Sequence, residues 1–135
     1  MSQWRVYLSR REIITYGPMS YFPIGRIIEE EIRKSDVKEG LVTVHAKGAT
    51  PAIIVSKRDE IGKVDEAIRK LVPTLGWKHG NAYAHLRSTL LSTVKTLIVS
   101  NGELTLPTDY EVFFLETRFV YNHRRQLHFY IRGKH

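Results

Sequence analysis

Residues 80–86 of this chain, Gly-Asn-Ala-Tyr-Ala-His-Leu, have the pattern of a helix start. Gly80 permits a tight approach, Asn81 is a preferred N-cap residue, and the residues that follow are mostly compatible with a helix. Asn81 and His85 are four positions apart and therefore share one helix face. Free backbone N–H groups, a cap amide and an imidazole would then meet at a positive helix terminus. That arrangement favours an anion and offers a group that can move a proton.

The length and composition are those of one folded domain, residues 1–135. The chain has 135 residues, of which 42% are hydrophobic, so we expect a proper core rather than disorder. The lack of cysteine excludes disulfides, thiolate catalysis and cysteine-bound zinc. No segment suits a membrane span, and the first five residues lack the apolar core of a secretion signal. We therefore expect a cytoplasmic protein without a membrane partner.

The charge balance predicts an anionic partner. The formal net charge is +7 and the sequence pI is about 9.8. The basic residues are spread along the chain, and the tight clusters are Arg10-Arg11 and His123-Arg124-Arg125. Because no recognised nucleic-acid-binding motif accompanies them, a phosphorylated small molecule or an inorganic anion is favoured over nucleic acid.

Hydrophobic periodicity and turn residues give the order of the elements. Helices are expected to begin near Pro23, near Asp59 as a cap, and at Asn81, where the side away from His85 carries Tyr83, Leu86 and Leu90 for packing. Residues 112–120 and 126–131 are expected to pair as antiparallel strands. This order predicts an α+β fold with a mostly antiparallel sheet and helices packed on one face. The other expected strands are residues 4–8, 12–16, 41–45, 52–56 and 94–99, the last followed by a hairpin turn at Asn101-Gly102.

Residues 80–87, GNAYAHLR, resemble the G-N-A-x-A-H-L-K motif of the secondary thiamine-phosphate synthase family, the YjbQ-like proteins. Other segments resemble the family in the same order: 40–44 the strand before its H-T-T-A segment, 102–106 its G-x-L-x-L segment, and 112–116 its I-F-F-x-E strand. Arg124-Arg125 resemble its basic C-terminal hairpin. The resemblance extends from the first helix to the C-terminus and implies a compact α+β fold that assembles as a homotrimer.

The resemblance also implies a site and an activity. The family has a cluster of histidines near a phosphate-sized anion site. Its members are credited with a low thiamine-phosphate synthase activity, which joins a pyrimidine diphosphate to a thiazole phosphate with loss of pyrophosphate. This chain departs from the pattern, because Gly48 replaces the histidine of the H-T-T-A segment and only Thr50 remains of its threonines. Of the usual imidazoles the chain keeps His85, with His79 either replacing a family aspartate or substituting for the lost histidine.

The expected catalytic residues are His85, His79 and Glu116. His85 would be a general acid or base, or would bind pyrophosphate as imidazolium. The competing interpretation is a helix histidine bonded to a backbone carbonyl. Glu116 lies in an apolar strand, where a buried carboxylate needs a partner, and an ion pair with Arg118 competes with catalysis. The anion-binding candidates are Asn81, Gly80, Lys47, Lys78 and Thr50.

No metal and no cofactor is predicted. His79, His85, Glu116 and His45 are the available ligands, but they lack the spacing of a known metal motif. The leading hypothesis is a weak thiamine-phosphate-synthase-like transferase acting on phosphorylated heterocycles. The alternative is a catalytically impaired family member that acts as an anion-binding or assembly protein. A third possibility is a nucleic-acid binder that uses the basic clusters.

Overall fold

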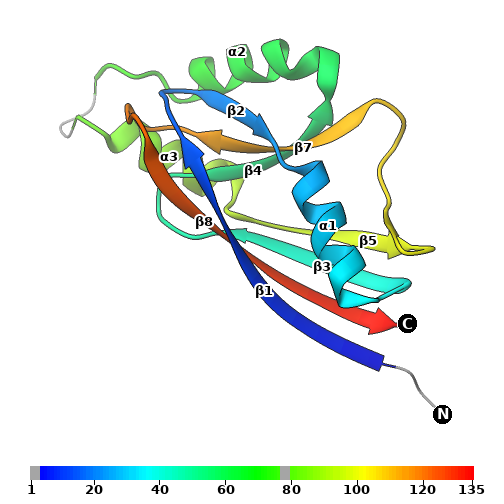
Figure 1. Ribbon diagram of the computed structural model, residues 1–135. Helices are drawn as coiled ribbons and strands as arrows, with labels where there is room; N and C mark the ends of the chain where they lie inside the picture. Colours follow the sequence, from blue (N-terminus) through cyan, green and yellow to red (C-terminus); the bar gives the residue numbers. More distant parts are fainter. Residues whose placement is uncertain (1–3, 77–79) are drawn as a thin grey trace.

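The computed structural model describes residues 4–76 and 80–135, which form two antiparallel sheets and three α-helices (Figure 1). The helices are α1 (Gly25–Ser35), α2 (Ile61–Leu71), which follows a 3-10 turn at Arg58–Glu60, and α3 (Ala82–Leu91). The strands are β1 (Trp4–Thr15), β2 (Ser20–Pro23), β3 (Glu39–Ala46), β4 (Ala52–Lys57), β5 (Val94–Ser100), β6 (Glu103–Leu104), β7 (Tyr110–Glu116) and β8 (His123–Lys134).

The larger sheet has the strand order β1-β8-β3-β5-β6 and curves along the length of the molecule (Figure 1). β1 pairs with β8 over twelve residues, from Trp4 opposite Lys134 to Thr15 opposite His123. The prediction of two separate strands in residues 4–16 is therefore wrong. The strand can continue through the basic residues because the inward-facing Arg11 is paired. Its Nη1 lies 3.2 Å from Glu30 Oε1 and 3.1 Å from Glu31 Oε2.

The smaller sheet has the order β2-β7-β4, and it corrects the predicted pairing of residues 112–120 with 126–131. β7 pairs with β2 and β4, whereas β8 lies in the other sheet between β1 and β3. Every residue from Val112 to Glu116 is buried. A strand of this kind needs partners at both edges and cover on both faces, which a terminal hairpin would not provide.

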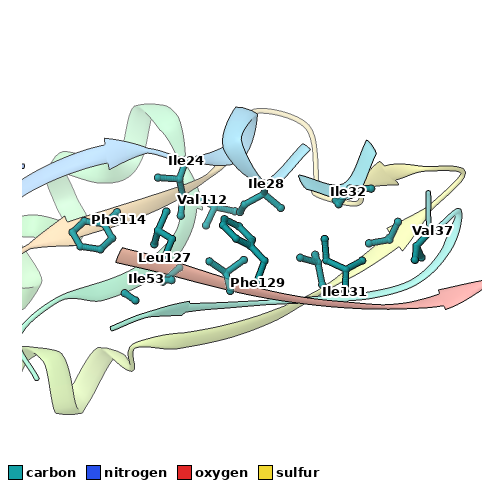
Figure 2. Packing of buried hydrophobic residues seen from close by; sticks show 14 residues of the cluster. Ile24, Ile28, Ile32, Val37, Ile53, Val112, Phe114, Leu127, Phe129 and Ile131 are labelled. Atoms are coloured by element: carbon teal, nitrogen blue, oxygen red, sulfur yellow. The ribbon is translucent and has the colours of Figure 1, made fainter. Parts of the chain in front are cut away.

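The main core lies between α1 and the two sheets (Figure 2). Ile24, Ile28 and Ile32 follow one face of α1, as their spacing predicts, and pack against Phe129 of β8 and Phe114 of β7. Burial of each such side chain contributes roughly 1.5–3 kcal/mol. The predicted helix is confirmed, although it begins at Gly25 and Pro23 ends β2.

The other face of the smaller sheet is covered by α2 and α3 (Figure 1). Ile68 of α2 and Leu91 of α3 pack there against Ile54 and Leu115. The expected second helix is confirmed, but its N-cap is Glu60 rather than Asp59. The architecture confirms the α+β class with antiparallel sheets. In the described part of the chain, every helix is too short or too polar to traverse a bilayer.

Candidate functional site

The third helix begins and ends as its sequence predicts, but only part of its predicted packing is observed. Asn81 occupies the N-cap position, yet its side chain makes no capping hydrogen bond. Tyr83 is buried, whereas Leu86 and Leu90 are 38% and 66% exposed. The expectation that all three would pack is therefore wrong for the two leucines.

Two polar side chains, which the sequence pattern did not mark for burial, fix α3 in place. The Nε and Nη2 atoms of Arg87 donate to the carbonyl of Val72, just after α2, at 3.0 and 2.6 Å. The guanidinium also lies 5.0 Å from the ring centroid of Tyr83. Ser88 Oγ donates to the carbonyl of Pro51 at 2.6 Å. These contacts tie the helix both to α2 and to the loop between β3 and β4.

An open cavity of about 390 Å³ lies between α3 and that loop. The exposed residue His85 forms part of the wall of this cavity. It lies on the same face of the helix as Asn81, one turn further along. The lining thus comprises one histidine and four hydroxyl-bearing residues from the helix side, with two small residues from the loop. The lining residues are Gly48, Ala49, His85, Ser88, Thr89, Ser92 and Thr93.

Gly48 and Ala49 of the loop line the same cavity. The N–H of Lys47 donates to the carbonyl of Gln126 at 3.0 Å. The next three N–H groups, of Gly48, Ala49 and Thr50, make no hydrogen bond with any described residue. Gly48 has φ +128°, a conformation that favours glycine. Successive unpaired N–H groups in a loop of small residues are a common form of anion site.

Behind the loop lies a buried ion pair. Arg125 Nε donates to Glu116 Oε1 at 2.8 Å, and Nη2 donates to Oε2 at 2.6 Å. Thr15 Oγ1 donates to Oε1 at 2.7 Å. Burial by itself raises the pKa of Glu116, but the hydrogen bonds from Arg125 and Thr15 and the charge of Arg125 outweigh it, so the pKa lies below its usual value. Glu116 is therefore an ionised, fully engaged carboxylate at neutral pH.

The predicted Glu116–Arg118 ion pair is wrong. Only the backbone N–H of Arg118 reaches the carboxylate, at 3.2 Å from Oε2, while Arg125 supplies the charge. Arg125 was grouped with a basic surface cluster, yet it is only 7% exposed. The sequence contained one signal of this burial. Arg125 lies two and four positions before the apolar residues Leu127 and Phe129, so it shares their inward-facing side of β8.

The predicted site residues divide into three groups. His85 lines the cavity, and Thr50 lies buried beneath the loop, with Lys47 exposed at its start. Gly80 and Asn81 are exposed next to the first turn of α3 and do not line the cavity. His79 and Lys78 lie outside the described residues. The hydroxyl residues of the wall were not predicted, although Ser88, Thr89 and Ser92 follow His85 at helical spacing.

Over residues 4–76 and 80–135, no three His, Asp or Glu side chains converge as a metal site would require. His45 faces away from the buried Val44, as its place in the strand predicts. Its ring lies 6.2 Å, centroid to centroid, from that of His128 on the outer face of the larger sheet. The pair is thus separate from the cavity beside α3.

The arginines proposed for nucleic-acid binding do not form one free cluster. Arg11 is paired with Glu30 and Glu31, and Arg125 with Glu116. Arg10 and Arg124 are exposed, with Arg124 lying 3.9 Å from Glu12. Two of these four charges are therefore already neutralised within the fold.

Comparison with known proteins gives consistent matches. A "UPF0047 protein" of Archaeoglobus fulgidus is 34% identical over 97 residues, which cover 67% of this chain and 77% of the relative. A YbjQ-like protein of unknown function from Sulfolobus solfataricus superimposes with a TM-score of 0.88 at 25% identity, over 97% of this chain and 99% of the other. A hypothetical protein of Aeropyrum pernix does so with a TM-score of 0.85 at 24% identity, over 95% and 99% of the two chains.

The family model described as "UPF0047 protein YjbQ-like" matches residues 10–134. That span takes in the three helices, the cavity beside α3 and both sheets except for the first part of β1. The chain belongs to the YjbQ-like UPF0047 family.

Proposed function

We propose that the cavity beside α3 binds the phosphate or diphosphate group of a phosphorylated small molecule. The observation that carries this proposal is that His85 lines a space of about 390 Å³ together with Gly48 and Ala49, whose N–H groups make no hydrogen bond with any described residue. Phosphate oxygens accept hydrogen bonds, and we infer that the backbone of Gly48 and Ala49, the imidazole and the hydroxyls of Thr89 and Thr93 supply the donors, since Ser88 and Ser92 already donate to backbone carbonyls. The net charge of +7 favours the approach of such a ligand.

The chemistry that fits this site is the departure of pyrophosphate from a phosphorylated heterocycle. Negative charge develops on the leaving group, and preorganised N–H donors stabilise it. His85 is the lining residue whose side chain is suited to act as a general acid or base. Gly48, where the family has a histidine, leaves one imidazole fewer, so we expect either weak thiamine-phosphate-synthase-like activity or a member that binds the anion without turning it over.

Binding is tested by thermal unfolding in phosphate, pyrophosphate or thiamine phosphate at matched ionic strength, with chloride as reference. A ligand held only by the native state at one hundred times its Kd adds about 2.7 kcal/mol of stability. We expect His85→Ala to reduce pyrophosphate affinity at least tenfold. Leu86→Ala is the control, because its side chain is exposed and does not line the cavity. If none of the three ligands raises the melting temperature of wild type, the anion site is excluded.

Catalysis is tested separately. Wild type and His85→Ala are incubated with a pyrimidine diphosphate and a thiazole phosphate, and pyrophosphate release is followed. A slower variant supports a catalytic role for the imidazole. Equal rates would remove that role and leave anion binding as the function of the site.

We also propose that the chain assembles as a homotrimer. Supporting this, the outer face of the larger sheet exposes Val6, Leu8 and Ile98 at 62%, 69% and 56%. Exposed apolar groups gathered on one face often mark an association surface. Sedimentation velocity of wild type is expected to give a molecular mass three times the 15.7 kDa of one chain. The Leu8→Lys variant is expected to have a lower mass. Leu71→Lys, at a 75% exposed residue of α2, serves as the control. A monomeric wild-type chain would refute the assembly.

A further inference from the structure

We infer that Arg125 and Thr50 are positioning residues for the anion site: the buried guanidinium holds Thr50, and Thr50 holds the N–H groups of Gly48 and Ala49 in place. This inference rests on the proposed anion site. It assigns Glu116 a supporting role through Arg125 rather than contact with the ligand.

The contacts around Thr50 are the first step. Arg125 Nη2 donates to Thr50 Oγ1 at 2.8 Å, and Thr117 Oγ1 donates to the carbonyl of Thr50 at 2.5 Å. All three residues are at least nine-tenths buried. Thr50 is therefore held at its side chain by Arg125 of β8 and at its backbone by Thr117, which directly follows β7.

The neighbouring residues fix the rest of the loop. Lys47 is bonded through its N–H to Gln126, and the carbonyl of Pro51 accepts from Ser88 of α3. Between these fixed points lie Gly48 and Ala49. A Cβ added at Gly48 would come within 3.1 Å of Arg125 Nη1, so the guanidinium packs closely against the loop backbone.

The electrostatics indicate geometry rather than net attraction as the contribution of Arg125. Its charge is matched by Glu116, whose two oxygens it contacts at 2.8 and 2.6 Å, and it does not line the cavity. Donors that are already aimed at the ligand need no ordering when it binds, which strengthens binding. Loss of the link to Thr50 should therefore weaken anion binding without removing any group that touches the anion.

The test compares Thr50→Val with Ser35→Ala. Thr50→Val removes the hydroxyl that Arg125 contacts and keeps the shape of the side chain. Ser35 is a buried hydroxyl residue at the end of α1, bonded to Ile32 and Val37 and outside the cavity wall, so its loss is a matched control for stability. Pyrophosphate affinity is measured by calorimetry well below both melting temperatures. We expect at least a tenfold loss for Thr50→Val and less than a twofold change for Ser35→Ala.

A second measurement does not need the ligand. Backbone ¹⁵N relaxation at Gly48 and Ala49 should show lower order parameters in Thr50→Val than in wild type, and unchanged values in Ser35→Ala. Wild-type affinity in Thr50→Val, or unchanged order parameters at both amides, would overturn the positioning role while leaving the anion site intact. If wild type binds neither phosphate nor pyrophosphate, both the site and the positioning role fail.

Discussion

Removing the positive member of the buried ion pair should be among the most damaging single substitutions in this chain. Arg125→Met leaves the Glu116 carboxylate, which is 0% exposed, without the guanidinium that contacts both of its oxygens. Breaking a buried pair in this way costs about 3–5 kcal/mol, because a charge stays in the interior without compensation. Domains have unfolding free energies of about 5–15 kcal/mol, so the loss would be a large part of the total. At about 4 °C per kcal/mol it corresponds to a melting temperature roughly 12–20 °C lower.

The assay is urea unfolding of wild type, Arg125→Met, and the double variant with Glu116→Leu in addition. The double variant removes both charges and should recover much of the stability lost in the single variant, since an apolar pair of similar volume is often neutral. An unfolding free energy of Arg125→Met within 1 kcal/mol of wild type would refute the reasoning. So would a double variant less stable than the single one, because that would show that the uncompensated charge is not the cause.

Three further predictions concern stability. Phe114→Ala, at a 0% exposed position of the main core, should lower the unfolding free energy by about 3–5 kcal/mol in urea titrations; a loss under 1 kcal/mol would contradict the packing described above. The second prediction concerns pH. The stability that Glu116 contributes through its lowered pKa is present above the ordinary pKa of 4.5 and is lost as the pH falls through the pKa of the folded state. The difference in unfolding free energy between wild type and Glu116→Gln should therefore shrink below pH 4.5, and a difference that stays constant would argue against the ionised pair. Gly40→Ala would place a Cβ 2.0 Å from the carbonyl oxygen of Arg132, which is closer than packed atoms allow. Circular dichroism should therefore show little folded protein for this variant. A melting curve like that of wild type would show that β3 and β8 can move apart at this position.

The sequence was most informative where local periodicity decides the structure. Ile24, Ile28 and Ile32 marked α1, and residues 81–92 marked α3 with an error of one residue or less at each end. The turn at Asn101-Gly102 has positive φ at both residues, as the hairpin pattern predicts. These features depend on neighbours within a few positions, which a single sequence contains.

The failures concern partners far apart in the chain. Nothing near Glu116 indicates that its counter-ion is Arg125, because Arg118 is closer in sequence and equally charged. Similarly, the burial of β7 on both faces is visible as an apolar run, but its pairing with β2, about ninety residues earlier, is not. The cavity beside α3 joins a helix to a loop some forty residues away. Candidate residues were predicted on both segments, His85 in the helix and Thr50 in the loop, but no local pattern indicates that the two segments border one cavity.

The central place of β8 has a consequence for biosynthesis. It follows all the other described strands in chain order, yet it separates β1 from β3 in the larger sheet and carries Leu127, Phe129 and Ile131. Until it leaves the ribosome, β1 has no strand partner within the described fold, and the isoleucines of α1 lack their contacts with Leu127, Phe129 and Ile131. Pairing Trp4 with Lys134 closes a loop of nearly the whole chain, which makes folding slow relative to domains with local contacts. The nascent polypeptide should therefore depend on chaperones that shield its apolar surface during elongation.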